Sequence, residues 1–207
     1  MTDRINEIWD VPGYATVLDT AWIKLGVESD THYECLNMCA DLTSGSVLDA
    51  GCGMGHFFYI LKKRGYSEPY TGFDNSVEML KKARGYFPDD SSKFITGDIY
   101  NMEGLPYADT VTCFAVLIHL PEIETPVHEL WRHTVKRLII TTRVSDPEPS
   151  FLHLRAYSAG VDMPPGKMLH IRGDSRADLM KLFNGLGGSV NERVYDSRTS
   201  IFTIDRI

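Results

Sequence analysis

The chain has 207 residues, a length that suits one domain of ordinary or slightly large size. Hydrophobic residues make up 43% and charged residues 24%, values typical of globular proteins, so a fibrous or largely disordered chain is excluded. No apolar run approaches the roughly 20 residues that span a bilayer. Residues 1–10 lack the basic start and apolar stretch of a signal peptide. We therefore expect a cytoplasmic protein with no membrane partner.

The formal net charge of -7 is concentrated at the start of the chain. Residues 1–45 hold eight acidic and two basic residues, whereas the rest of the chain is nearly balanced. Nucleic-acid surfaces need clustered Lys and Arg to contact phosphates, so the charge argues against nucleic acid as a partner. The simplest interpretation of the acidic start is a solvated helix face.

Four cysteines are present, and their spacing is not that of a metal site. They form no Cys-x-x-Cys pair, and no histidine spacing completes a zinc set. Cys35 and Cys39 lie four residues apart, which places them on one face of a helix. We expect small buried thiols and no bound metal.

Up to residue 143, apolar periodicity predicts helices at the start and then alternating strands and helices. The first two helices are expected at residues 14–26 and 33–42. Strands are expected at residues 46–50, 70–73, 93–96, 110–118 and 137–142. The helices between them are expected at residues 56–64, 77–84 and 124–135. Such alternation predicts a parallel sheet with helices on both faces.

The regular alternation ends after Arg143. Residues 145–172 carry two proline-rich turns and are too long for a simple connection, which is typical of a lid or binding segment. A helix at residues 175–186 and a strand pair at 190–195 and 199–205 complete the chain. We expect one domain, residues 1–207, built from an N-terminal helical cap (1–45), a core (46–144), an insertion or lid (145–173), and the last helix with a closing hairpin (174–207).

A glycine-rich loop follows the first expected strand, at Asp49-Ala50-Gly51-Cys52-Gly53-Met54-Gly55. A strand–glycine loop–helix unit lets the backbone and the helix N-terminus approach a ligand closely. The dinucleotide fingerprint Gly-x-Gly-x-x-Gly fails, because His56 stands where its third glycine belongs. Asp49 is unfavourable next to a pyrophosphate but suits a ligand with an ammonium group. The loop therefore favours S-adenosylmethionine over NAD.

Three motifs in order make the sequence resemble the class I S-adenosylmethionine-dependent methyltransferases. They are the loop above, Gly72-Phe73-Asp74-Asn75-Ser76 at the second strand, and Gly97-Asp98-Ile99 after the third. The resemblance covers residues 46 to 143 well, and the closing hairpin in pattern only. It implies a Rossmann-like α/β fold: a mostly parallel seven-stranded sheet with helices on both faces, ending in an antiparallel hairpin. It also implies S-adenosylmethionine as cofactor and S-adenosylhomocysteine as product.

The resemblance assigns roles to residues of these motifs. The Asp74 carboxylate would accept hydrogen bonds from both ribose hydroxyls, and Asp98 one from the adenine amine. Ile99 would pack on the adenine ring, while Asp49 would order the loop and favour the ammonium group. The full expected cofactor set is Asp49, Gly51, Cys52, Gly53, Gly55, Asp74, Asn75, Asp98, Ile99, Ala115 and Tyr14.

The stretch after the fourth strand bears on the methyl acceptor. Base and glutamine methyltransferases usually carry Asn/Asp-Pro-Pro-Tyr there, whereas this chain has Phe114-Ala115-Val116-Leu117-Ile118-His119-Leu120-Pro121. This segment resembles the branch that acts on small molecules. His119 is the candidate catalytic residue, with packing beneath the cofactor as the alternative. His153, Tyr157 and His170 are candidate acceptor-binding residues, with exposed or packing roles as the alternative.

The sequence thus predicts methyl transfer to a small molecule at oxygen, nitrogen or carbon. One alternative is a tRNA or protein methyltransferase, for which the basic residues between 128 and 143 would supply a surface. Another alternative is a cofactor-binding or regulatory subunit of the same fold without catalysis. The oligomeric state is not encoded in any visible pattern. If the acidic cap lines the pocket, a neutral or cationic acceptor is favoured over an anionic one.

Overall fold

The computed structural model describes residue 9, residues 31–155 and residues 169–207. The helix expected at residues 14–26 lies outside these described residues, as do Tyr14 and Tyr157. Within the described part, no helix is long and apolar enough to cross a membrane.

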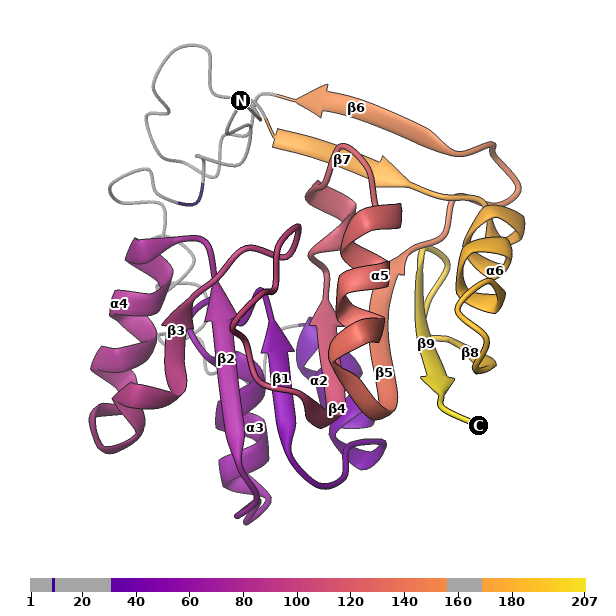
Figure 1. Ribbon diagram of the computed structural model, residues 1–207. Coiled ribbons are helices and arrows are strands. Elements are labelled where there is room, and N and C mark those ends of the chain that lie inside the picture. The colour runs from indigo at the N-terminus through magenta and orange to yellow at the C-terminus, as the bar shows by residue number, and fades with distance from the viewer. Residues whose placement is uncertain (1–8, 10–30, 156–168) are drawn as a thin grey trace.

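Seven strands form one sheet in the order β3-β2-β1-β4-β5-β9-β8 (Figure 1). The strands are β1 (Val47–Ala50), β2 (Tyr70–Asp74), β3 (Phe94–Thr96), β4 (Ala108–Phe114), β5 (Thr134–Arg143), β8 (Ser189–Val194) and β9 (Thr199–Asp205). The first five are parallel, and β9 runs antiparallel to both β5 and β8. The predicted sheet and its closing antiparallel hairpin are confirmed.

Helices cover both faces of the sheet, as predicted (Figure 1). One apolar cluster joins the sheet to α2 (Thr31–Asp41), α3 (His56–Lys63) and α4 (Val77–Tyr86). A second cluster joins the other face to α5 (Glu124–His133) and α6 (Arg176–Asn184). All four residues of β1 are buried, which is expected of a central strand with helices on both sides.

Local signals place α4 directly after the end of β2. The Ser76 side chain caps α4 by accepting a hydrogen bond from the Met79 N–H at 3.2 Å, which satisfies one of the unpaired donors of the first turn. Met79, Leu80 and Ala83 form the buried face of the helix. The cap therefore fixes the direction in which the chain leaves Asp74.

The strand expected at residues 110–118 is too long, because β4 ends at Phe114. Ala115 adopts a positive φ of 56°, and the chain then turns into a short 3-10 helix, η4 (Leu117–His119). Leu117 is fully buried in this turn. An apolar run that packs into the core looks the same in sequence whether it is a strand or a turn, and this caused the error.

The insertion contains a hairpin that the sequence did not reveal. Strands β6 (Phe151–Arg155) and β7 (Leu169–Gly173) pair with each other in a separate antiparallel sheet. This hairpin lies beyond the carboxyl ends of β1 and β4 (Figure 1). In open α/β sheets, ligands bind at that end of the strands.

Candidate active site

A cavity of about 400 Å³ opens at the carboxyl ends of β1, β2, β4 and β5. This volume lies within the roughly 300–1,000 Å³ of small-molecule sites. Eight residues of the expected cofactor set line it: Asp49, Gly51, Cys52, Gly53, Asp74, Asn75, Ile99 and Ala115. The structure therefore brings together the glycine loop, the end of β2 and the segment after β3.

The glycine loop is fastened to the end of β2. The N–H groups of Gly51 and Cys52 both donate to the Phe73 carbonyl, at 2.8 and 3.0 Å. Gly51 and Gly53 adopt positive φ values of 69° and 54°, which side chains other than glycine rarely tolerate. The loop thereby turns its backbone along the cavity wall and leads into α3.

Asp74 is held in one orientation by backbone donors. Its Oδ2 accepts from the Gly53 N–H at 2.9 Å, and its Oδ1 accepts from the Ser76 N–H at 2.9 Å. Asp74 is thus a preorganised carboxylate in the cavity wall.

Asp49 is a buried carboxylate in the cavity wall, 2% exposed. It accepts hydrogen bonds from the Tyr70 hydroxyl at 2.7 Å and from the Thr112 hydroxyl at 2.8 Å. Burial raises the pKa of Asp49 to about 6, although these two hydrogen bonds oppose the shift. The group is therefore anionic at neutral pH while its hydrogen-bond partners are neutral hydroxyls. A cationic ligand group would complement it.

The close approach of the loop to η4 gives a testable consequence at Gly51. A Cβ at this position would lie 2.3 Å from Val116 Cγ2, and Val116 lines the cavity. We expect Gly51→Ala to lower the melting temperature and to weaken cofactor binding at least tenfold. Gly65→Ala is the matched control, because Gly65 also has a positive φ, of 74°, but a Cβ there would meet nothing within 4 Å.

Gly65→Ala should lose only about 1–2 kcal/mol of stability, because an alanine is strained at a positive φ. Its cofactor affinity should be unchanged. Thermal melting and calorimetric titration of both variants would check this. If Gly51→Ala bound the cofactor as the wild type does, the loop would not approach the ligand.

Two residues of the expected cofactor set do not line the cavity. Gly55 lies at the start of α3, where it adopts a positive φ of 86°. Asp98 is exposed, and its Oδ1 accepts from the Tyr100 N–H at 2.9 Å within a turn. Their contacts with a cofactor, and that of Tyr14, stay predictions.

The other end of the cavity is lined by residues from η4, β5 and the start of the chain. His119 faces it, and its Nδ1 lies 3.0 Å from the His170 carbonyl oxygen. The Trp9 ring packs edge-on against His119, with ring centroids 5.2 Å apart. Thr142 is 2% exposed, and its Oγ1 has no hydrogen-bond partner within the described residues. Such a hydroxyl at a cavity wall is available to a ligand.

The acceptor-binding residues expected from the insertion are placed differently from His119. His153 is exposed and stacks on Phe151, with ring centroids 4.9 Å apart. His170 is 4% exposed, and its backbone carbonyl, not its side chain, contacts His119. Neither side chain lines the cavity, and Tyr157 lies outside the described residues. Their binding of an acceptor stays a prediction.

The sequence did not single out several residues of the wall. They are Cys35 and Leu36 of α2, Thr141, Thr142 and Arg143 of β5, and Tyr195, Asp196 and Thr199 at the closing hairpin. The three β5 residues end a parallel strand, so the carboxyl-end rule could have identified them. The hairpin residues come from a distant segment, and no local pattern reports their position. Within the residues that the structure describes, no cluster of three or more potential metal ligands occurs.

Comparisons with known proteins identify the domain that contains this cavity. Residues 47–137 match a methyltransferase domain family. Trans-aconitate 2-methyltransferase of Escherichia coli is 34% identical over 92 residues, which cover 44% of this chain and 34% of that protein. The aligned region thus spans about a third of the length of this curated relative.

Solved structures show the same fold over most of the chain. Magnesium protoporphyrin IX methyltransferase from Synechocystis PCC 6803, with bound S-adenosylhomocysteine, superposes with a TM-score of 0.62 at 19% identity, covering 85% of this chain and 84% of the other. The DhpI–SAM–HEP complex superposes with a TM-score of 0.70 at 18% identity, covering 98% and 95%. Residues 47–137 therefore carry a methyltransferase domain, and the chain has the fold of S-adenosylmethionine-dependent methyltransferases.

Proposed function

We propose that this protein transfers the methyl group of S-adenosylmethionine to a small-molecule acceptor. One observation carries the proposal: Asp74, Asp49, the glycine loop and His119 all line the same cavity. One end has the donors and acceptors that suit a nucleoside with an ammonium group. The other end, with His119 and Thr142, would hold the acceptor.

The described residues fit this cofactor. Asp74 presents two fixed carboxylate oxygens for the ribose hydroxyls, and Ile99 supplies an apolar surface for the adenine ring. Asp49 is buried and anionic at neutral pH, which suits the ammonium group of the methionine part. The small residues Gly51, Gly53 and Ala115 leave room beside them.

When bound, the cofactor supplies a methyl group on a sulfonium sulfur, which leaves as a neutral thioether. The chain has to align the acceptor with that methyl group and exclude water. His119 is the candidate general base, because it lines the cavity at the end away from Asp74. Burial, followed by the nearby Arg143 and His170 side chains, lowers the pKa of His119, while the His170 carbonyl opposes the shift. The imidazole is thus neutral at physiological pH and competent to accept a proton.

A small acceptor is favoured by two observations. The cavity is a pocket of about 400 Å³, and the relatives include methyltransferases named for trans-aconitate and magnesium protoporphyrin IX. Basic side chains near α5 are also engaged in the fold. Arg132 pairs with Glu129 at 2.5 Å, Lys136 with Asp109 at 2.9 Å, and Arg137 with Asp205 at 2.5 Å. This pairing argues against a tRNA surface there.

The test follows the methyl label. A cell extract is first separated into small metabolites, RNA and protein. Each fraction is then incubated with this protein and S-adenosylmethionine labelled in the methyl group. We expect label in the metabolite fraction, and Asp74→Ala should abolish it. Label only in RNA or only in protein would overturn the small-molecule acceptor. No label in any fraction would contradict catalysis and favour a binding subunit. The cytoplasmic location expected from the sequence stays a prediction.

A further inference from the structure

The hairpin β6–β7 is attached to the protein core beside His119. Strand β7 packs against η4, and its last residue is followed by Asp174, which forms an isolated parallel bridge with Val144 just after β5. The Ser145 N–H donates to the Asp174 carbonyl at 3.0 Å. One end of the hairpin is therefore joined to the carboxyl end of β5, where Thr142 and Arg143 line the cavity.

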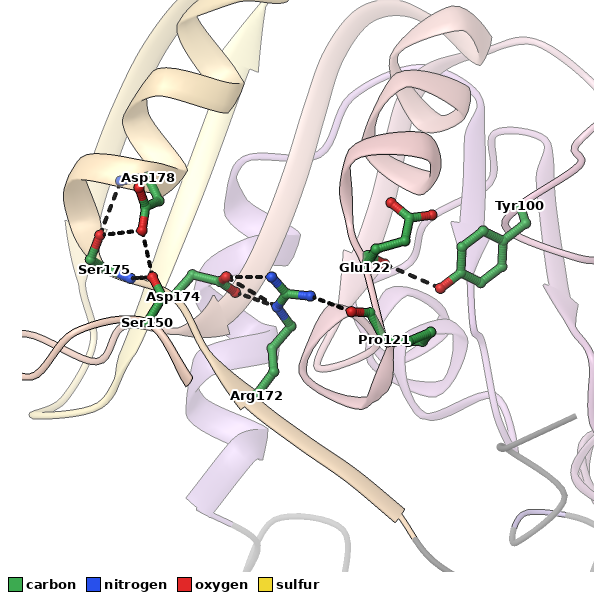
Figure 2. Close-up of polar contacts among 8 residues, drawn as sticks. All are labelled: Tyr100, Pro121, Glu122, Ser150, Arg172, Asp174, Ser175 and Asp178. Carbon is green, nitrogen blue, oxygen red and sulfur yellow. Dashed lines mark hydrogen bonds and ion pairs between the residues drawn. The ribbon is translucent and has the colours of Figure 1, made fainter. Parts of the chain in front are cut away.

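Arg172 provides a second attachment, made by its side chain (Figure 2). Its Nε donates to Asp174 Oδ2 at 2.8 Å and its Nη2 to Asp174 Oδ1 at 2.7 Å, an arrangement that fixes the guanidinium plane. Its Nη1 then donates to the Pro121 carbonyl at 3.1 Å. Pro121 follows His119 by two residues, so this fork links β7 to the segment that carries His119. Asp174 has a side chain only 5% exposed and Arg172 one 17% exposed, so solvent screens the pair weakly.

The contact between β7 and His119 determines which imidazole nitrogen carries the proton. The His170 carbonyl oxygen can only accept a hydrogen bond, so the neutral ring must carry its hydrogen on Nδ1, 3.0 Å away. The lone pair then lies on Nε2, for which the described residues offer no hydrogen-bond partner. The charged and titratable neighbours of the ring are Arg143 from β5 and His170 from β7, and both disfavour the imidazolium form.

We propose that the hairpin β6–β7 is a positioning element that holds His119 in its Nδ1–H form, with Arg172 as the positioning residue, so that Nε2 accepts a proton from the methyl acceptor. The proton transfer in this inference rests on the proposed function, whereas the positioning of His119 does not. The acceptor atom then enters the site carrying a proton, as a hydroxyl or an ammonium group does. That proton moves to Nε2, giving an imidazolium that passes it to water. An acceptor that is already an ionised carboxylate needs no such group.

The first test needs neither cofactor nor acceptor. The full chain, labelled with ¹⁵N in its histidines, is titrated by NMR, and His119 is assigned by comparison with His119→Gln. In the wild type we expect the Nδ1–H form and a pKa below the usual 6.5. Arg172→Ala should give a mixture of the two neutral forms and move the pKa back toward 6.5.

The controls separate positioning from general loss of structure. Arg176→Ala removes a comparable arginine of α6 that pairs with Asp146 and Glu192, away from His119, and should leave the spectrum of His119 unchanged. Arg172→Ala leaves Asp174 as a buried carboxylate without this partner, which destabilises the fold. The double variant Arg172→Gln with Asp174→Asn removes both charges and should show the same change in His119 while staying folded.

The second test measures transfer of labelled methyl into the separated metabolite fraction. Arg172→Ala should lower kcat about 10- to 100-fold, with the affinity for S-adenosylmethionine within twofold of wild type. The kcat of Arg172→Ala should also rise with pH over a different pH range from the kcat of the wild type. The variant Arg172→Lys should keep more of the wild-type kcat than Arg172→Ala does. An Nε2–H form in the wild type, or a folded Arg172→Ala with unchanged His119 form and rate, would overturn the proposal. If the wild type transferred no label yet His119 behaved as expected in the NMR titration, the proposed function alone would fail.

Discussion

Asp74→Ala should weaken S-adenosylmethionine binding by about 100-fold or more. The Asp74 carboxylate is already fixed by the Gly53 and Ser76 N–H groups, so it meets the ribose hydroxyls without losing freedom on binding. Two hydrogen bonds to a charged group are together worth about 3 kcal/mol, or roughly two orders of magnitude in affinity. Calorimetric titration at pH 7.5 measures the change directly.

Loss of Asp74 also leaves two backbone donors without their acceptor, so a part of the effect could come from the fold. Thermal melting of the same sample detects this, and Asp74→Asn keeps an oxygen acceptor of the same size. We expect Asp74→Asn to be folded and still at least tenfold weaker in binding. Asp90→Ala is the control, because Asp90 pairs with Lys62 and Lys93 and does not line the cavity. An affinity for Asp74→Ala equal to that of the wild type would remove Asp74 from the cofactor site.

Asp49→Asn should stabilise the chain without cofactor and weaken cofactor binding. Burial raises the pKa of Asp49 from 3.8 to about 6. The folded protein therefore favours the protonated form, and ionisation of Asp49 lowers stability progressively as pH rises from about 4 to 6. Above pH 6 this cost reaches about 3 kcal/mol at most, at 1.36 kcal/mol per pKa unit. Asparagine avoids the cost, so the melting temperature at pH 7.5 should rise by several degrees.

The pH dependence makes this prediction specific to Asp49. The gain in stability of Asp49→Asn should shrink below pH 6 and vanish only at about pH 3, below the unfolded-state pKa of 3.8, where the wild-type carboxyl is protonated in both states. Binding of the cationic cofactor at pH 7.5 should weaken at least tenfold. Asp109→Asn is the opposite case, because Lys136 and Ser46 lower the pKa of Asp109 to about 2, and it should reduce stability at neutral pH. If Asp49→Asn matched the wild type in both stability and cofactor affinity, Asp49 would be neither a destabilising buried charge nor a part of the cofactor site.

The sheet and the cofactor end of the cavity could be predicted because their signals are local. Apolar strands, a serine cap at Ser76 and a glycine loop after β1 each fix their own stretch of backbone. Parallel strands then bring their carboxyl ends to one edge, so Asp49 and Asp74 meet although 25 positions separate them in the sequence. The positive φ of Gly51 explains why the loop needs glycine.

The acceptor end could not be predicted to the same depth because it depends on contacts between distant segments. Thr142 joins the cavity wall through the register of β5, and Tyr195 through the turn between β8 and β9. The β6–β7 hairpin is short and residues 156–168 separate its strands, so the proline-rich turn in that stretch does not indicate that they pair. His170 was singled out for its side chain, whereas its backbone carbonyl makes the contact with His119. Side-chain chemistry alone does not reveal a backbone role.

We infer that the glycine loop, Asp49 and Asp74 form a site for S-adenosylmethionine and not for a dinucleotide. Calorimetric titration of the wild-type chain at pH 7.5 with S-adenosylmethionine, S-adenosylhomocysteine and NAD tests it most directly. We expect one site per chain for each of the first two ligands and no binding of NAD. Binding of NAD without binding of S-adenosylmethionine would contradict it.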